Sequence, residues 1–321
     1  MADQLMRSRS SREQRKESEI ASRLADNVCA PPLRAIPGLM WLAVPTITHL
    51  RAPHVHMSLA ADAIAQHGRL PTALPLTTIP DEPASTTVRR AGVARLDGVL
   101  TPTTAARLRA HVLDHINTGN NEYSEVLSPR AADGAAQTRW DLRLPLAAPV
   151  RAALRELLRG PLGDAFADLC GANAELWELA ALVSAGGAAP QLVHADVLWD
   201  PDPLLFTAFV ALQDVSPALG PTRFFPGTHT EEAHDAHDDD DDDAWLAAQP
   251  AHRALLGAGD ASLYDARTLH CGDANAADAR RALFYVTFRH EAAAEARALG
   301  NEAAHSILAP YDGRWRLGRW R

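Results

Sequence analysis

Beyond Leu176 the chain becomes a series of short apolar runs, each bounded by Gly, Pro or Asp. Several strands of this length with turn signals between them are typical of a β-barrel or a β-sandwich. The runs predicted as strands are Leu192–Trp199, Leu204–Leu212, Thr222–Phe225, Ala261–Tyr264 and Ala282–Phe288. We therefore expect a mainly β domain.

Helices are predicted before that region. Thr101-Pro102 provides an N-cap and a first-turn proline for a helix whose apolar face carries Leu108, Val112 and Ile116. A second helix is predicted from about Pro149 to Leu158, and Val93–Leu100 predicts a short strand and turn. These helices should flank the strands.

The start of the chain differs from the rest. Arg7–Arg23 is rich in Ser, Arg and acidic residues without an apolar stripe, and Pro71–Pro83 has the Pro/Thr composition of a linker. We expect residues 1–85 to be a variable extension, either a targeting segment or a disordered one, and residues 86–321 to be the main folded domain. Within that domain, residues 234–243 form an acidic insert that must remain solvated.

Charge and composition exclude several classes of partner. The net charge is −9, and the six aspartates of Asp238–Asp243 supply most of it, so no large basic field remains for nucleic acid. The apolar stretch Ile36–Leu50 is shorter than the about 20 residues of a membrane helix. Three widely spaced cysteines do not form a secreted disulfide framework. We expect a cytoplasmic protein, with organelle import as the alternative.

A pattern of metal ligands lies in the first predicted strand. On a strand, His194 and Asp196 would project from one face, because side chains alternate with a period of two. Two imidazoles and one carboxylate with open positions beside them are the ligand set of non-haem Fe(II) oxygenases. A His-x-Asp pair by itself also occurs as a structural hydrogen-bonding pair.

The third ligand must come from a later strand. His229, His234, His237 and His252 are predicted in a turn, the acidic loop and a helical stretch, whereas His270 lies where a strand meets a turn. His270 is therefore the best candidate.

The final predicted strand places a cation inside the barrel. Arg281, Leu283, Tyr285 and Thr287 share one face, and the opposite face is apolar and should pack on helices. A buried guanidinium needs an anionic partner, and its fork matches a carboxylate. Arg281 therefore indicates a bound dicarboxylate, with an internal salt bridge to Asp265 as the alternative.

Together these motifs resemble the phytanoyl-CoA dioxygenase-like family of Fe(II)/2-oxoglutarate oxygenases. The matching segments are His194-Ala-Asp196, Phe209–Val215, Gly220–His229, Tyr264–Gly272 and Arg281, in that order. The resemblance covers about residues 90 to 290. It implies a double-stranded β-helix (jelly-roll, cupin-like) core, Fe(II) on His194, Asp196 and His270, and 2-oxoglutarate on Arg281 beside Phe209.

The resemblance also implies the reaction: O2 is consumed, 2-oxoglutarate is decarboxylated to succinate and a small molecule is hydroxylated. Asp196 is a carboxylate, whereas halogenating relatives have Ala or Gly there. Three departures from the family pattern are Phe209 in place of Trp, Gly272 in place of Ser and Thr228 in place of Ser. Side chains expected at the mouth of the site are Trp199, Arg223, Tyr264 and Tyr285.

Two other functions use the same residues. A non-catalytic cupin-like binding or scaffold protein would typically lack a metal ligand or the arginine, and this chain has all four. A hydrolase or isomerase could bind zinc with the same three ligands, but Arg281 would then have no evident function.

Overall fold

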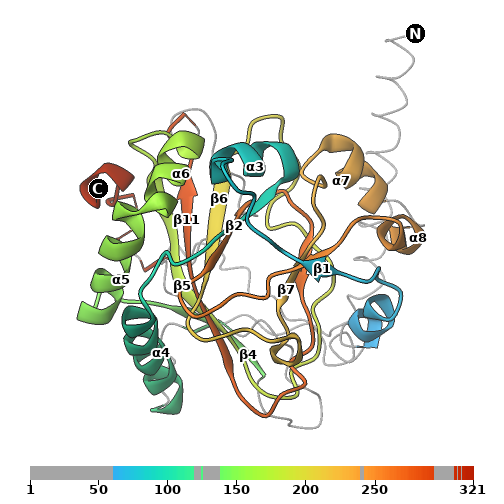
Figure 1. Cartoon of the computed structure of the whole chain (residues 1–321), viewed down its shortest axis with the longest axis horizontal. Helices are drawn as coiled ribbons and strands as arrows, with labels where there is room; N and C mark the ends of the chain where they lie inside the picture. Colours follow the sequence, from blue (N-terminus) through green and yellow to red (C-terminus); the bar gives the residue numbers. More distant parts are fainter. Residues whose placement is uncertain are drawn as a thin grey trace, which may run out of the picture. The chain divides into compact units, whose positions relative to one another are not determined.

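A computed structural model describes residues 61–118, 124–125, 138–238, 242–292, 307–308, 310–311 and 313–321. The core is a double-stranded β-helix made of two facing sheets (Figure 1). The larger sheet has the strand order β2-β9-β6-β11-β5-β4-β3 and the smaller one β1-β8-β7-β10. The predicted class, mainly β with flanking helices, is confirmed.

The larger sheet is built from β2 (Val93–Leu96), β3 (Ser124–Glu125), β4 (Arg139–Arg143), β5 (Glu175–Ser184), β6 (Leu205–Ala211), β9 (Ala261–Asp265) and β11 (Arg281–Arg289). β11 lies at its centre and pairs antiparallel with both β5 and β6. The smaller sheet contains β1 (Leu74–Pro75), β7 (Thr222–Phe224), β8 (His252–Arg253) and β10 (His270–Gly272).

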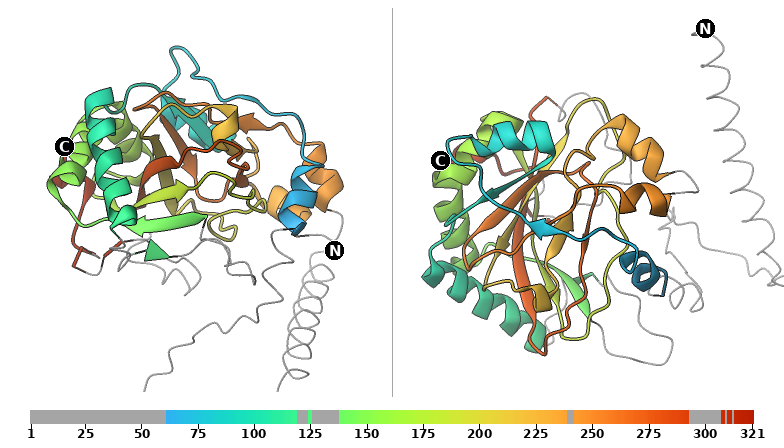
Figure 2. Two further views of the ribbon diagram at one scale, coloured as in Figure 1. Left: turned by 90° about the horizontal axis from the view of Figure 1, so that it is seen from below. Right: turned by 45° about the vertical axis from the view of Figure 1, so that its right-hand side comes forward.

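Helices cover the outer face of the larger sheet (Figures 1 and 2). These helices are α3 (Ala84–Ala91), α4 (Pro102–Asn117), α5 (Ala148–Arg159) and α6 (Pro161–Cys170). The apolar residues of β11, namely Ala282, Phe284, Val286 and Phe288, belong to the core cluster that these helices complete. The alternation predicted for this strand is therefore confirmed, and Thr101 caps α4 by accepting a hydrogen bond from the backbone N–H of Thr104.

The remaining elements lie at the smaller sheet. α7 (Glu231–His237) and α8 (Asp242–Ala247) follow β7, and Leu246 of α8 packs into a buried cluster with Phe225 and Cys271. The acidic insert predicted over residues 234–243 begins inside α7, and residues 239–241 lie outside the described residues. No helix in the described part of the chain is both long enough and apolar enough to cross a membrane.

Residues 61–85, which the sequence assigns to a variable extension, contact the sheets. Residues 61–67 are helical, and β1 pairs with β8 within the stretch whose composition indicates a linker. We name residues 61–76 the N-terminal strap. The division of the chain at residue 85 stays a prediction, as does any targeting role of residues 1–60, which lie outside the described residues.

Candidate iron centre

Three side chains predicted as metal ligands meet at the inner surface of the smaller sheet. Asp196 Oδ1 lies 3.5 Å from His270 Nε2 and 3.9 Å from His194 Nε2. The two imidazole rings are 4.6 Å apart between centroids. One ligand atom from each residue thus converges on a common point, as a single metal ion requires.

Backbone carbonyls fix the orientation of both imidazoles. His194 Nδ1 lies 2.8 Å from the carbonyl oxygen of Leu192, and His270 Nδ1 lies 2.9 Å from that of Thr268. Since a carbonyl only accepts, each Nδ1 carries the proton and each Nε2 presents a lone pair. This arrangement is typical of metal-bound histidine. Burial lowers the pKa of His270, which favours the same neutral form.

The carboxylate is oriented by a phenol. Tyr264 donates a hydrogen bond of 2.7 Å to Asp196 Oδ2, which leaves Oδ1 facing the two imidazoles. Burial, followed by the charge of Asp196, raises the pKa of Tyr264 well above its usual range, so this hydroxyl remains a donor. The donor set of two nitrogens and one oxygen on one side of a point fits Fe(II) and leaves positions open.

The segment that carries two of these ligands is not the strand that the sequence predicts. Of residues 192–199, only His194 forms a bridge, and it is antiparallel to His270. The neighbouring backbone bonds go elsewhere, because Gln191 N donates to Gly272 O and Asp196 N donates to Ala266 O. Hydrogen bonds to such separate partners cannot form a ladder in one register. The prediction of a strand over Leu192–Trp199 is therefore wrong, although both ligands reach the site.

Arg281 of β11 is buried inside the barrel. Its guanidinium is 0% exposed and donates to the carbonyl of Gly220 and, at 3.2 Å, to Ser184 Oγ. Its Nε has no hydrogen-bond partner among the described residues. Asp265, the partner in the alternative interpretation, pairs instead with Arg267 at 2.6 Å, so the alternative of a salt bridge between Arg281 and Asp265 is contradicted.

A second guanidinium lies beside it. Arg139 of β4 donates to the same Ser184 Oγ at 2.7 Å and is also buried. Burial, and then the charge of Arg139, lowers the pKa of Arg281 to about 9, while burial lowers that of Arg139 to about 10. Two like charges in a low-dielectric interior favour an anion between or beside them.

Sequence reasoning missed Arg139 because it predicted no strand there. The alternation in Arg139–Arg143 was the available signal: Trp140 and Leu142 pack in the helix-covered core, which leaves positions 139, 141 and 143 facing the barrel interior. On the same face of this sheet, Tyr285 of β11 donates a 2.8 Å hydrogen bond to Asp141 of β4 over the intervening strand β5.

Aromatic rings fill the space around the ligands. The Phe209 ring lies 5.2 Å from Tyr264, 5.7 Å from Tyr285 and 6.4 Å from His270, between centroids. Phe209 and these two tyrosines are therefore near the metal ligands, as expected. Trp199 is only half-buried.

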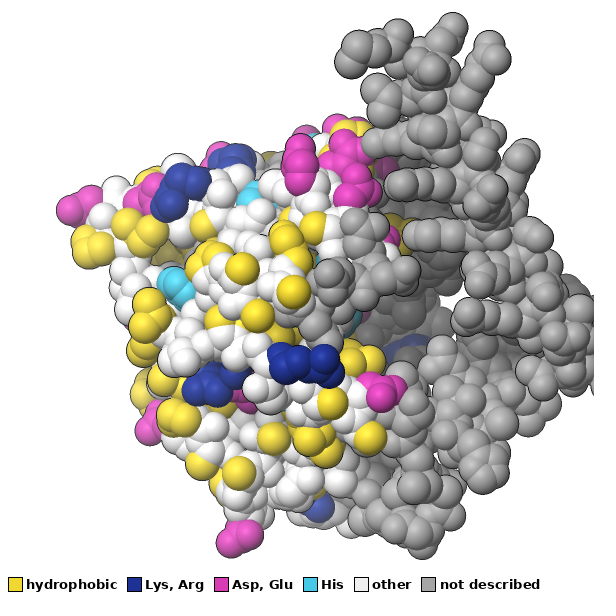
Figure 3. All heavy atoms as spheres, turned by 90° about the vertical axis from the view of Figure 1, so that its right-hand side faces the viewer, with side chains coloured by type: hydrophobic (Ala, Val, Ile, Leu, Met, Phe, Trp, Pro, Cys, Tyr) yellow, Lys and Arg dark blue, Asp and Glu magenta, His cyan; other side chains and the backbone are white. Residues whose placement is uncertain are grey.

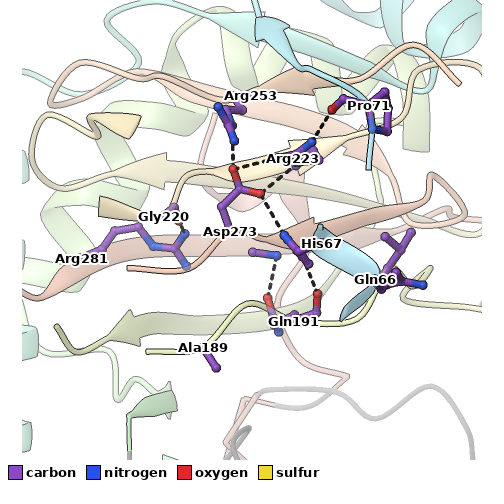
Figure 4. A network of polar contacts seen from close by, with 12 residues as sticks. Gln66, His67, Pro71, Ala189, Gln191, Gly220, Arg223, Arg253, Asp273 and Arg281 are labelled. Carbon is purple, nitrogen blue, oxygen red and sulfur yellow. Dashed lines mark hydrogen bonds and ion pairs between the residues drawn. The ribbon is translucent and has the colours of Figure 1, made fainter. Parts of the chain in front are cut away.

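Arg223 does not line the site, contrary to expectation. Its neighbour Phe224 stacks on His270 inside the barrel, so Arg223 faces the outside of the smaller sheet. There it pairs with Asp273 at 3.0 Å, and Arg253 pairs with the same carboxylate at 2.6 Å (Figure 4).

His67, Cys271 and Asp273 form a second group with metal-ligand atoms close together. The two guanidiniums already occupy the carboxylate of Asp273, and burial raises the pKa of the Cys271 thiol. A cation would therefore face two positive charges and a neutral thiol, so this group does not fit a metal.

Comparisons with known proteins show which family the chain resembles and which solved structures are similar to it. The family model described as phytanoyl-CoA dioxygenase (PhyH) matches residues 88–283, more than half of the chain. No curated protein matches. The solved structure of AviO1 from Streptomyces viridochromogenes Tue57 is 21% identical over 67% of this chain and 98% of its own, with a TM-score of 0.53, and shows a shared fold.

Two further solved structures come from nogalamycin biosynthesis. The non-heme alpha ketoglutarate dependent epimerase SnoN is 23% identical over 64% of this chain and 80% of its own, with a TM-score of 0.49. The carbocyclase SnoK is 23% identical over 68% and 87%, with a TM-score of 0.48.

Proposed function

We propose, from the premise that this chain belongs to the phytanoyl-CoA dioxygenase family, that it hydroxylates a small organic molecule. Family membership makes it a non-haem iron enzyme that depends on 2-oxoglutarate and O2. In the proposed reaction, one oxygen atom of O2 enters a C–H bond of the substrate. The other enters the succinate that forms as 2-oxoglutarate loses CO2.

The convergence of His194, Asp196 and His270 carries this proposal. Their ligand atoms lie within 4.8 Å of one another, with both imidazoles and the carboxylate oriented by hydrogen bonds. Bound iron would supply the redox chemistry that activates O2. Because Asp196 would occupy a coordination position as a carboxylate, no position is vacated for a halide, which favours hydroxylation.

Arg281 would hold the distal carboxylate of 2-oxoglutarate. Its buried Nε–H is without a partner among the described residues, and the neighbouring charge of Arg139 adds to the attraction for an anion. Phe209 would pack against the cosubstrate from its position between His270 and Tyr285 and would exclude water from it. Each of these roles is a binding or orienting role.

Anaerobic titration of the protein with Fe(II) and 2-oxoglutarate tests the proposal. We expect a charge-transfer absorption band that requires both components, is absent in Asp196→Ala and does not form in Arg281→Ala. Asp202→Asn, which changes an exposed aspartate nearby, should leave the band intact. Iron binding without this band would contradict the proposal and favour a scaffold or a hydrolase.

The substrate would be sought by screening small molecules for stimulated succinate formation. A product that mass spectrometry shows to be heavier than the substrate by one oxygen atom would support hydroxylation. Products of unchanged mass, or of mass reduced by two hydrogens, would contradict it while leaving the cosubstrate assignment in place.

A further inference from the structure

We infer that the N-terminal strap, residues 61–76, is part of the metal-binding unit, in which Gln66 and His67 position the backbone that carries His194 and Asp196. This inference rests on the proposed ligand roles of those two residues. The strap precedes the matched family region, which begins at residue 88, so it is an addition to that region in this chain. The contacts that support the inference all lie around the start of the ligand segment, residues 191–196 (Figure 4).

Gln66 supplies a hydrogen bond that the ligand segment would otherwise lack. The backbone N–H of Val193, one residue before His194, donates to Gln66 Oε1 at 2.9 Å, and both residues are buried. The segment has no regular strand on this side, so a side chain takes the place of a ladder partner. Loss of the acceptor would leave a buried N–H unsatisfied, at a cost of about 1–3 kcal/mol.

His67 fixes the segment at its first residue. His67 Nε2 donates to the carbonyl oxygen of Gln191 at 2.8 Å, and its Nδ1 lies 3.6 Å from Asp273 Oδ1. Gln191 in turn exchanges bonds with β10, because its N–H donates to Gly272 O and its Oε1 accepts from Gly272 N at 3.0 Å. His67 thus contacts the point where the segment of His194 joins the strand of His270.

The rest of the strap is anchored to the smaller sheet. Pro71 O accepts a 2.7 Å hydrogen bond from Arg223, and the N–H groups of Leu74 and Leu76 donate to Ala251 O and Arg253 O. The strap therefore has a fixed base from which Gln66 and His67 reach the ligand segment. Gln66 and His67 therefore hold the backbone that leads into the bridge between His194 and His270, and the relative position of these two ligands decides how well a metal ion fits.

Measurement of metal affinity tests the inference and does not depend on enzymatic turnover. Anaerobic titration with Co(II), followed by its ligand-field absorption, should give affinities about tenfold weaker for Gln66→Leu and for His67→Ala, since each loses one hydrogen bond that orients a ligand segment. Gln66→Glu keeps the acceptor and His67→Gln keeps an N–H donor, so both should bind nearly as the original protein does. Ile64→Ala changes an exposed residue of the same helical turn and is the matched control.

The melting temperature of the metal-free variants separates positioning from general stability. A merely structural role would lower the melting temperature while folded Gln66→Leu bound Co(II) with undiminished affinity, and this result would overturn the inference. Wild-type affinity in the double variant Gln66→Leu/His67→Ala would overturn it as well. If the original protein itself bound no Co(II), the proposed function would fail instead, so the two failures are distinguishable.

Discussion

Arg281 places a positive charge inside the barrel, and no carboxylate of the described residues pairs with it. A buried cation destabilises a fold unless an anion compensates it, and an apolar side chain of similar size is often neutral or stabilising in its place. Burial and the Arg139 charge, which lower the pKa of Arg281 to about 9, express this cost. In its proposed role, Arg281 would contribute to cosubstrate binding at the expense of the stability of the protein.

We predict that Arg281→Met has a melting temperature equal to or above that of the original protein when 2-oxoglutarate is absent. Addition of 2-oxoglutarate with a non-oxidising divalent metal should raise the melting temperature of the original protein, because a ligand that binds only the native state stabilises it. The variant should show no such rise. A rise of equal size in Arg281→Met, measured by differential scanning fluorimetry, would remove Arg281 from the cosubstrate site.

Tyr264 orients Asp196, one of the three proposed metal ligands. Tyr264→Phe removes the donor to Asp196 Oδ2, so the carboxylate loses its fixed orientation. Loss of such an outer hydrogen bond typically costs about 10–100-fold in metal affinity, and we expect this loss in Co(II) titrations. Tyr311→Phe, which removes the hydroxyl that accepts from Leu146 N far from the site, is the control. Equal affinities in both variants would contradict the assignment.

At the scale of elements, the alternation of apolar and polar residues correctly predicted the two faces of a strand that is paired on both sides. β11 has two antiparallel neighbours, so its apolar and polar faces are separated as the sequence indicates. The ligand segment has the same alternation in Val193, His194 and Ala195 but is held by a bridge and side-chain contacts. Periodicity reports which residues are buried, and not which backbone groups are paired, and for this reason the contacts of the strap were also missed.

The turn between α3 and β2 links an element end to the site. Gly92 ends α3 with a φ of 78°, and a Cβ there would lie 2.5 Å from Thr268 Oγ1 and 2.7 Å from His229 Nδ1. Thr268 is the residue whose carbonyl orients His270. Gly92 is therefore needed for its left-handed conformation and for its lack of a side chain.

We predict that Gly92→Ala is more destabilising than Gly98→Ala. Gly98 also has a positive φ, but nothing lies within 4 Å of a Cβ built there, so its replacement costs only backbone strain of about 1 kcal/mol. The additional close contacts at Gly92 should raise the loss to about 2–4 kcal/mol. Chemical denaturation of the two variants measures the difference, and equal losses would show that Thr268 and His229 move aside freely.

At the scale of the whole molecule, the family match and the two-sheet core confirm what five short motifs in order predicted about the fold. The candidate ligands and Arg281 could be proposed from the sequence because their residue types have few other reasons to occur in that order. Orienting contacts from distant segments, such as Tyr264 to Asp196 and Gln66 to Val193, depend on tertiary packing. Linear spacing carries no signal for them.

The acidic run Asp238–Asp243 follows α7 and lies partly outside the described residues. Acidic side chains gather near the top of the face shown in Figure 3, at the height of α7, which carries Glu231, Glu232 and Asp235. We predict that replacement of Asp238–Asp243 by serines leaves 2-oxoglutarate consumption within about twofold of that of the original protein, because the run contains none of the proposed ligands and neither Arg281 nor Phe209. Leu246→Ala, in the buried face of α8, should instead destabilise the protein by about 2–4 kcal/mol. A severe loss of turnover in the serine variant would connect the run to catalysis.

The reciprocal bridge between His194 and His270 has one more consequence. The N–H of each residue donates to the carbonyl of the other, at 2.9 Å and 2.8 Å, while their rings face the same point. An ion chelated there would close a ring through both backbones, so that neither amide could open to solvent before the ion dissociates. Deuterium uptake at these two amides should then be slower when the ion is bound, so that the uptake rate reports how much of the protein holds the ion.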